Sequence, residues 1–337
     1  MPGLRTTRRA FVAGSLAAVA AARSAAAQDG GAGSAGHWPD HPVKLVVPYP
    51  AGGSTDVLTR ILAEHLKDRL GQSFVVENKP GAGGNIGIAA VTGSAPDGYT
   101  VGSATVGHFA INQYLYQHMP YDPEKDFVPV TMTWDMPNVF VVASEHVPGK
   151  TLAEFIAWAK PRPNVAYGSP GVGTSPHLSA ALFATRTGLA GTHVPFRGAA
   201  QTIPAMLAGD VVYAIDNLAS YMSTIESGQM RALAVTSAQR WPTLPGVPTM
   251  AEAGMKDFVV TSWAGFVVPA GTPRPMIDRL AATMRAIASD AEVQRRFQVA
   301  GARCLSSTPE EIAAKAAKER PMWQEMVRIS GAKAGSG

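Results

Sequence analysis

Residues 44–70 read KLVVPYPAGGSTDVLTRILAEHLKDRL, and this stretch decides the fold class. The mainly apolar run from Lys44 to Pro48 predicts a strand. From Thr55 to Leu70 the apolar side chains recur at helical spacing and charged ones fill the opposite face, so an amphipathic helix is expected. Gly71 is expected to end this helix as its C-terminal cap. A strand followed by a covering helix is the repeating unit of an α/β fold.

The same alternation continues to the end of the chain and predicts a mostly parallel sheet covered by helices. Further strands are expected at residues 74–77, 100–104, 128–133, 139–144, 165–168, 194–196, 211–215, 232–236 and 261–268. Further helices are expected at residues 152–160, 176–187, 200–208 and 273–289, and from Pro309 onward, with an interruption at Pro321.

The length of the chain indicates two domains, because about 300 residues exceed what one hydrophobic core usually serves. We place the chain crossings near Pro137 and Val260. Lobe 1 then comprises residues 41–137 plus 261–331, and lobe 2 comprises residues 138–260. Two such α/β lobes joined by a hinge form a clamp.

The first 27 residues are typical of a bacterial export signal. They contain four arginines and no acidic residue, followed by an apolar run and small residues for cleavage. Arg8-Arg9-Ala10-Phe11 matches the twin-arginine pattern. The apolar run is shorter than the roughly 20 residues that a membrane span needs. Residues 28–40 are expected to be a flexible leader, and the mature protein a soluble periplasmic one.

Charge and cysteine content exclude other classes of protein. Without the four leader arginines, 25 basic side chains stand against 25 acidic ones, so nothing suggests a nucleic-acid partner. Cys304 is the only cysteine, so there is no intrachain disulfide and no lipid anchor near the cleavage region. His37 and His41 are four residues apart with Asp40 between them, but they lie at the frayed start of the mature chain. The other histidines lack metal-ligand spacing, and no nucleophile–base pair or cofactor motif is evident. We therefore expect no catalytic residue, no metal and no cofactor.

Four polar, glycine-rich loops follow predicted strands, where ligands bind in open α/β sheets. The first, residues 48–56, reads PYPAGGSTD and leads into the first helix. Its glycines allow close backbone approach, and the start of the helix offers unpaired N–H groups that suit an anion. The alternative is a tight turn in which Ser54 or Thr55 caps the helix. The candidate ligand-binding residues of this loop are Tyr49, Ala51, Gly52, Gly53, Ser54, Thr55 and Asp56.

The second loop, residues 80–87, reads PGAGGNIG. A dinucleotide fingerprint would need glycine in place of Ile86, and the Lys and Ser/Thr of a P-loop are missing, so a nucleotide site is not expected. The candidates here are Gly83, Gly84 and Asn85.

The third loop, residues 168–177, reads GSPGVGTSPH. A hydrolase nucleophile elbow around Ser169 would need glycine where Tyr167 stands. Thr174 and Ser175 are better explained as hydroxyl donors or helix caps, and His177 as a packed residue. The candidates are Ser169, Thr174 and Ser175.

The fourth region combines residues 195–199 (PFRGA) with Asp216-Asn217. Arg197 can form a two-pronged pair with a ligand carboxylate, or an ordinary ion pair. Asp216 either orients Arg197 or accepts hydrogen bonds from a neighbouring loop. The candidates are Arg197, Gly198, Ala199 and Asp216.

Taken together, these motifs resemble the substrate-binding proteins of tripartite tricarboxylate transporters, the Bug family. The matching stretches run almost end to end: residues 42–56, 76–85 (VENKPGAGGN), 121–123 with 126–130 (YDP and DFVPV), 171–175 with 177–178 (GVGTS and HL), 232–237 (ALAVTS), and 247–249 with 252–254 (VPT and EAG). Phe196 departs from the family, where an aromatic residue with a hydroxyl is frequent.

The resemblance implies a type II periplasmic-binding-protein fold that closes on a small di- or tricarboxylate, aliphatic or aromatic. It implies that the loops at 49–56 and 80–87 hold one carboxylate and that those at 168–175 and 196–200 help to choose the ligand. The implied partners are the membrane components of a transporter, and the receptor is expected to be a monomer. The alternatives are a sensory receptor for a membrane kinase and a hydrolase or isomerase on the same fold.

Overall fold

The computed structural model describes residues 38–334 of the 337-residue chain. Residues 41–334 belong to one compact unit, and the described residues before His41 belong to a separate one. The predicted export signal and most of the 28–40 leader lie outside the described residues. Between residues 38 and 334, none of the helices is long and apolar enough to cross a membrane.

The strands, in chain order, are β1 (Val43–Val47), β2 (Phe74–Asn78), β3 (Thr100–Thr105), β4 (Phe127–Ala143), β5 (Tyr167–Ser169), β6 (His193–Pro195), β7 (Tyr213–Asn217), β8 (Met230–Val235), β9 (Thr261–Pro269) and β10 (Arg303–Cys304). The helices are α2 (Ser54–Leu70), α3 (Asn85–Thr92), α4 (Asn112–Leu115), α5 (Leu152–Ala159), α6 (Ser175–Thr187), α7 (Ala199–Ala208), α8 (Leu218–Glu226), α9 (Arg274–Ala288), α10 (Ala291–Val299) and α11 (Pro309–Ser330). A short 3₁₀ helix, η1 (Ala82–Gly84), precedes α3, and a short π-helix, η2 (Gly107–Ile111), precedes α4.

The opening strand and helix form as their sequence predicts. Leu58, Leu62 and Leu66 are fully buried along one side of α2, and the charged residues between them face solvent. The helix ends at Gly71, which takes the left-handed conformation (φ 75°) that glycine adopts without steric cost. The local pattern of α2 therefore agrees with its packing.

The sheet is mixed, so the prediction of a mostly parallel sheet is wrong. β1 pairs in parallel with β2 and β3, and β5 with β6 and β7. β9 runs antiparallel to β3 and β4, and β4 antiparallel to β7, β8 and β10. A buried strand is apolar in either orientation, so its composition does not reveal the direction of its neighbour.

β4 is one strand of 17 residues where two were predicted. Its Phe127–Pro137 part pairs with β9, and Asn138–Ala143 pairs with β7 and β8. The strand continues because it exchanges partners at this point, and the N–H of Asn138 is satisfied by the Thr236 hydroxyl at 2.9 Å.

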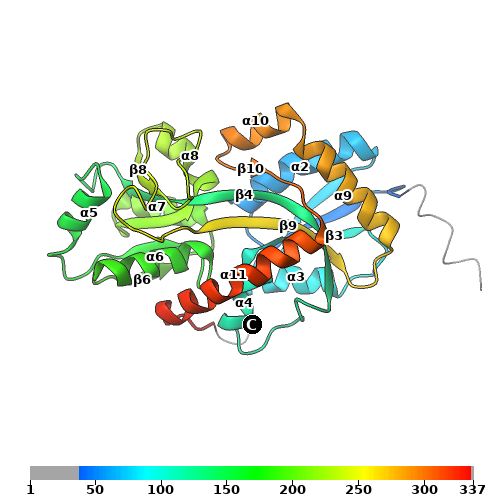
Figure 1. Cartoon of the computed structure of the whole chain (residues 1–337), viewed down its shortest axis with the longest axis horizontal. Coiled ribbons are helices and arrows are strands. Elements are labelled where there is room, and N and C mark those ends of the chain that lie inside the picture. The colour runs from blue at the N-terminus through cyan, green and yellow to red at the C-terminus, as the bar shows by residue number, and fades with distance from the viewer. Residues whose placement is uncertain (1–37, 335–337) are drawn as a thin grey trace, which may run out of the picture. The chain divides into compact units, whose positions relative to one another are not determined.

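We call β2, β1, β3, β9, β10 and the first part of β4 the first sheet segment, and the second part of β4 with β5–β8 the second sheet segment. In Figure 1, β4 runs from the helices α2, α9 and α10 on one side to α5–α8 on the other. The partner exchange falls at the predicted crossing near Pro137. The division into two moving lobes remains a prediction.

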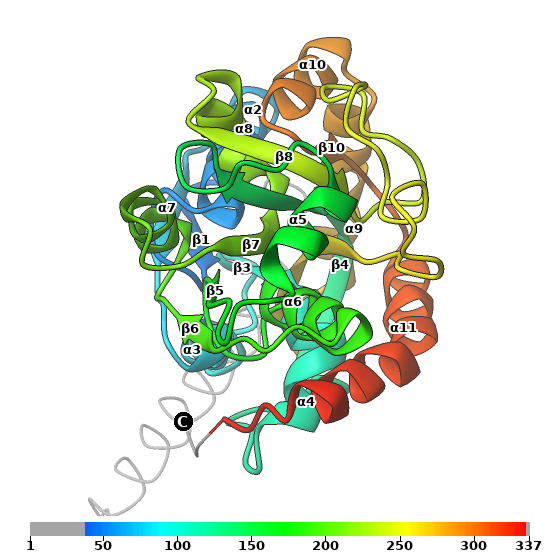
Figure 2. The same cartoon turned by 90° about the vertical axis from the view of Figure 1, so that its left-hand side faces the viewer.

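The C-terminal helix packs against both sheet segments. α11 contacts η2 and β4, and it lies beside α6 in the views of Figures 1 and 2. Its first turn is closed by a capping box between Thr308 and Glu311, as the sequence predicts. The helix continues through Pro321, so the predicted interruption is wrong.

Candidate ligand cavity

A cavity lies between the loops of the two sheet segments. From the first segment it is lined by the β1–α2 loop, the end of β3 and Ser262 of β9. From the second it is lined by the loops that lead into α6, α7 and α8. The predicted site residues that line it are Tyr49, Ala51, Gly53, Ser54, Thr55, Thr174, Ser175, Arg197, Gly198, Ala199 and Asp216.

Four helices begin at this cavity. Its wall includes the first residues of α2 and α6 (Ser54, Ser175), the first residue of α7 (Ala199) and Asn217, which precedes α8. The first N–H groups of a helix have no partner within the helix, and the helix dipole makes this end positive. The cavity is therefore suited to an anion.

Three of these helices have no side-chain cap. The residues at their N-caps are Gly53 for α2, Gly198 for α7 and Asn217 for α8, and none of them bonds to the first turn. Thr151, Asp290 and Thr308 cap α5, α10 and α11, whereas α3 and α9 also lack a side-chain cap. The first-turn N–H groups of α2 and α8 have no side-chain partner. In α7 the N–H of Gln201 donates to the Gly198 carbonyl at 3.0 Å, so the N–H groups of the two residues before it are the ones available to a ligand.

At α6, Thr174 is the cap, and its hydroxyl accepts a hydrogen bond from the N–H of His177 at 3.4 Å. At α2, neither Ser54 nor Thr55 caps the helix, so that alternative for the first loop is wrong. The physical reason is that the helix already begins at Ser54, so both hydroxyl residues lie inside its first turn.

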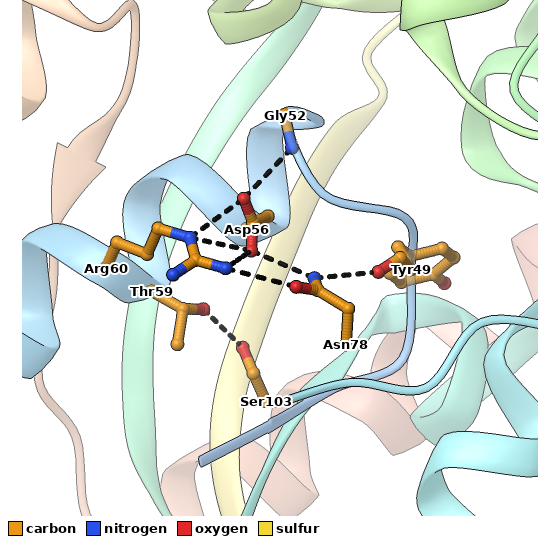
Figure 3. Close-up of polar contacts among 7 residues, drawn as sticks. All are labelled: Tyr49, Gly52, Asp56, Thr59, Arg60, Asn78 and Ser103. Carbon is orange, nitrogen blue, oxygen red and sulfur yellow. Dashed lines mark hydrogen bonds and ion pairs between the residues drawn. The ribbon is translucent and has the colours of Figure 1, made fainter. Parts of the chain in front are cut away.

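The β1–α2 loop is held by a network beneath it (Figure 3). Asp56 accepts hydrogen bonds from the N–H of Gly52 (2.9 Å), Asn78 Nδ2 (2.9 Å) and Arg60 Nε (3.0 Å). Asn78 Nδ2 also donates to the carbonyl of Tyr49 at 3.0 Å. The loop is thus fixed at Tyr49 and at Gly52.

Asp56 and Gly52 are support residues of this loop and do not line the cavity. Asp56 is buried, and its carboxylate points at the network. Burial alone would raise the pKa of Asp56, but the hydrogen bonds from Arg60, Gly52 and Asn78 outweigh it and hold the pKa below its usual value. The prediction that both residues bind the ligand is not supported by this geometry.

Comparison with known proteins identifies the family. A family model described as "Tripartite tricarboxylate transporter family receptor" matches residues 58–326. The chain belongs to this receptor family. The resemblance and the α/β periplasmic-binding-protein fold predicted from the sequence are confirmed.

Individual relatives cover most of the receptor. "Protein BugT" of Bordetella pertussis is 38% identical over 302 residues, which are 89% of this chain and 92% of BugT. The structure of R. palustris Rpa4515 with adipate has a TM-score of 0.85 and 36% identity, covering 88% of this chain and 99% of that one. MatC from Rhodopseudomonas palustris with bound malate has a TM-score of 0.80 and 29% identity, covering 86% and 100%.

The glycine turn of the receptor lies next to the cavity. Gly83 and Gly84 line an adjoining groove together with Tyr49, Thr174 and Arg197. Gly84 has φ 94°, and a β-carbon there would come within 2.3 Å of His108 Nε2. The Tyr49 hydroxyl lies 2.9 Å from Thr105 Oγ1 and 3.4 Å from the Gly83 carbonyl, so it connects the turn to the first loop.

Two predicted ligand residues point into the protein instead. Asn85 is buried, and its Oδ1 accepts hydrogen bonds from Asn112 Nδ2 at 2.7 Å and the Tyr121 hydroxyl at 2.8 Å. Ser169 is fully buried, with Oγ 2.7 Å from His193 Nε2. Neither residue lines the cavity. Their backbones lie in the predicted loops, but their side chains bond to other elements.

Asp216 does line the cavity, but it does not orient Arg197. Its carboxylate accepts hydrogen bonds from the N–H of Asn217 at 2.7 Å and the Tyr221 hydroxyl at 3.2 Å. Burial raises the pKa of Asp216 to about 7. No ion pair between residues 38 and 334 joins it to Arg197, whose guanidinium stays available at the cavity wall.

Several polar residues of the site were not among the candidate ligand-binding residues, although Asn217 belongs to the fourth region named from the sequence. Asn217 Nδ2 donates to Ser54 Oγ at 3.1 Å and so joins the two sheet segments across the cavity. Thr105 ends β3, and the rule that ligands bind at strand ends would have found it. Ser262 lies at the start of antiparallel β9, where that rule gives no signal.

The described part of the chain, residues 38–334, contains no cluster of three or more His, Cys, Asp or Glu side chains that could hold a metal ion. His37, one of the two histidines near the start of the mature chain, lies outside that part.

Proposed function

We propose that this protein is a periplasmic receptor that captures a small organic carboxylate and delivers it to the membrane components of a tripartite tricarboxylate-type transporter. The observation that carries the proposal is the set of three helices, α2, α7 and α8, that begin at one cavity without a side-chain cap. Their N–H groups and positive dipole ends favour a carboxylate. Relatives solved with adipate and with malate support the same ligand class.

We propose that one ligand carboxylate binds to the first turn of α2 at Gly53, Ser54 and Thr55. Thr174, Ser175 and Arg197 face the same space from the second sheet segment and would contact the remainder of the ligand. Neutral N–H and hydroxyl donors hold a carboxylate without a fixed ion pair, which allows release to the transporter.

We propose that the receptor closes as a clamp, with lobe 1 of residues 41–137 and 261–331 and lobe 2 of residues 138–260. The bond between Asn217 and Ser54 would form on closure. Small-angle scattering tests this: saturating ligand should reduce the radius of gyration, and an unchanged profile at proven saturation would argue against closure.

A non-catalytic role agrees with the chemistry of the wall. Among its residues, all between 49 and 262, there is no histidine, lysine or cysteine, and Asp216 is the one carboxylate; both of its oxygens already accept hydrogen bonds, from the N–H of Asn217 and the Tyr221 hydroxyl. The Ser169–His193 pair does not face the cavity as a catalytic dyad would, because Ser169 is fully buried and absent from the wall.

The test is a thermal-shift screen of mono-, di- and tricarboxylates, since a ligand that binds only the native state raises the melting temperature. Titration calorimetry then gives the affinity, and NMR of the recovered ligand detects any turnover. The proposal predicts at least one carboxylate that binds and is recovered unchanged. A screen without a binder would contradict the receptor function, and a converted ligand would indicate an enzyme.

A further inference from the structure

The cavity wall contains a single acidic residue among those between 49 and 262 that form it, Asp216. Asp216 is 1% exposed, at the end of β7 and directly ahead of α8. A lone acid is unexpected in a cavity toward which four helix N-termini point. A carboxylate ligand bound there would be repelled by it unless the ligand brings a compensating group.

The two hydrogen bonds of Asp216 indicate that it acts as an acceptor. The backbone N–H of Asn217 donates to Oδ1 at 2.7 Å, and the Tyr221 hydroxyl lies 3.2 Å from Oδ2. An ionised carboxylate has about four acceptor sites, so about two remain. A buried acceptor that is left without a partner is unfavourable, and more so if it is charged.

We propose that Asp216 selects carboxylate ligands that also carry a hydroxyl or ammonium group, and that it accepts a hydrogen bond from that group. This inference rests on the proposed receptor function and narrows its ligand class to hydroxy- and amino-carboxylic acids. Such a ligand places its carboxylate at the helix N-termini and its donor at Asp216, so both charges are satisfied. An acid without a donor leaves Asp216 facing a second negative charge.

Malate carries such a hydroxyl and adipate carries none, so the solved relatives bound to them differ in this respect. Receptors of this fold are thus solved both with an acid that carries a donor and with one that carries none.

Among the charged and titratable groups around Asp216 that are named here, Asp216 is the one that changes its charge near neutral pH. β4 places apolar Val139 opposite Asp216. The others are Arg197 on the wall, Tyr221 on α8, Tyr49 on the β1–α2 loop and His177 on α6, which packs against β7. Burial raises the pKa values of both tyrosines, to about 12 for Tyr49, and lowers that of His177 to about 3. Because burial raises the pKa of Asp216 to about 7, affinity for a donor ligand should fall as the pH drops from 8 to 6.

The experiment uses matched acids that differ only in the substituent beside the carboxylate. The sets are succinate, malate and aspartate; glutarate, 2-hydroxyglutarate and glutamate; and phenylacetate, mandelate and phenylglycine. Titration calorimetry of the purified receptor at pH 8 should give, in every set that binds, at least about tenfold tighter binding of a substituted acid. The hydroxy and amino members separate the two kinds of donor.

The variant Asp216→Asn keeps the shape and an acceptor oxygen but removes the charge, and should reduce the preference to about threefold or less. Asp210→Asn is the matched control, since Asp210 is exposed in the loop before β7 and absent from the wall, and should keep the preference. If Asp216→Asn does not fold, the pH series on the wild-type receptor gives the same decision.

Equal binding of the unsubstituted acid would overturn the inference, as would a preference that survives in Asp216→Asn. An affinity for the substituted acids that does not fall from pH 8 to pH 6 would also overturn it. Unsubstituted acids should instead bind more tightly at pH 6, because protonation of Asp216 removes its repulsion of the ligand carboxylate. Failure of every acid in all three sets would count against the carboxylate-receptor function itself. Binding without preference leaves that function intact and removes only the role of Asp216.

Discussion

Replacing Asp56 by asparagine should loosen the β1–α2 loop without removing a ligand contact. The carboxylate accepts from the N–H of Gly52, from Asn78 and from Arg60 (Figure 3). An asparagine offers one acceptor oxygen, and its NH₂ group faces one of these donors. One buried donor then loses its partner.

The magnitude follows from these bonds. An unsatisfied buried donor costs about 1–3 kcal/mol, and the remaining bonds lose the charge assistance, about 1 kcal/mol more. The Arg60 pair adds little, because the side chain of Arg60 is 49% exposed. We expect a loss of about 2–4 kcal/mol in the free energy of unfolding, or roughly 5–10 °C in melting temperature.

The assay pairs thermal unfolding with titration calorimetry. Affinity should fall for all carboxylates by a similar factor, because the loop is displaced but no contact to one ligand is lost. Glu64→Gln is the control, since Glu64 lies on the same helix, is 62% exposed and pairs with Arg296 at the surface. It should change the free energy of unfolding by less than about 0.5 kcal/mol. A wild-type melting temperature for Asp56→Asn would refute the support role, and a changed ranking of ligands would mean that Asp56 touches them.

Three further outcomes are expected. Asp216→Asn should stabilise the protein at pH 8 by as much as about 4 kcal/mol and hardly at pH 4, as measured by urea unfolding. Burial raises the pKa of Asp216 from 3.8 to about 7, so the wild-type protein loses stability as the pH rises between these values. Equal gains in the free energy of unfolding at both pH values would contradict this. Gly84→Ala should lower the free energy of unfolding by about 2–5 kcal/mol, because the added β-carbon would clash with His108 and the backbone has positive φ. Gly71→Ala, which has positive φ but open space around it, should lower it by about 1–2 kcal/mol, and equal losses would argue against the clash. Lysine at both Arg8 and Arg9 should leave unprocessed precursor in the cytoplasm on immunoblotting, and normal export would remove the twin-arginine prediction.

Local features of the fold could be predicted because neighbouring residues determine them. The 3.6-residue spacing of Leu58, Leu62 and Leu66 specifies α2 whatever packs on it. Gly71 and Thr308 mark helix ends through their own backbone and side-chain chemistry. The loops after strands could be placed as site candidates for the same reason, since strands and helices alternate in a known order.

Side-chain direction at the site could not be predicted. Asp56, Asn85 and Ser169 lie in the predicted loops, but their partners Asn78, Asn112 and His193 come from other segments. A polar side chain in a glycine-rich loop has the same appearance in sequence whether it faces a ligand or supports the loop. The difference depends on which donors the fold brings near it.

The sequence by itself determined the α/β class, the helix at residues 55–70, the glycine loops and the receptor family, because these depend on local periodicity and motif order. Tertiary structure decided that β4 is one strand with two sets of partners and that Asn217 meets Ser54 across 163 positions of the chain. It also decided that Asp216, and not Asp56, is the acid in the cavity wall. These outcomes depend on packing between segments far apart in the chain, which determines the burial and the hydrogen-bond partners of each polar group.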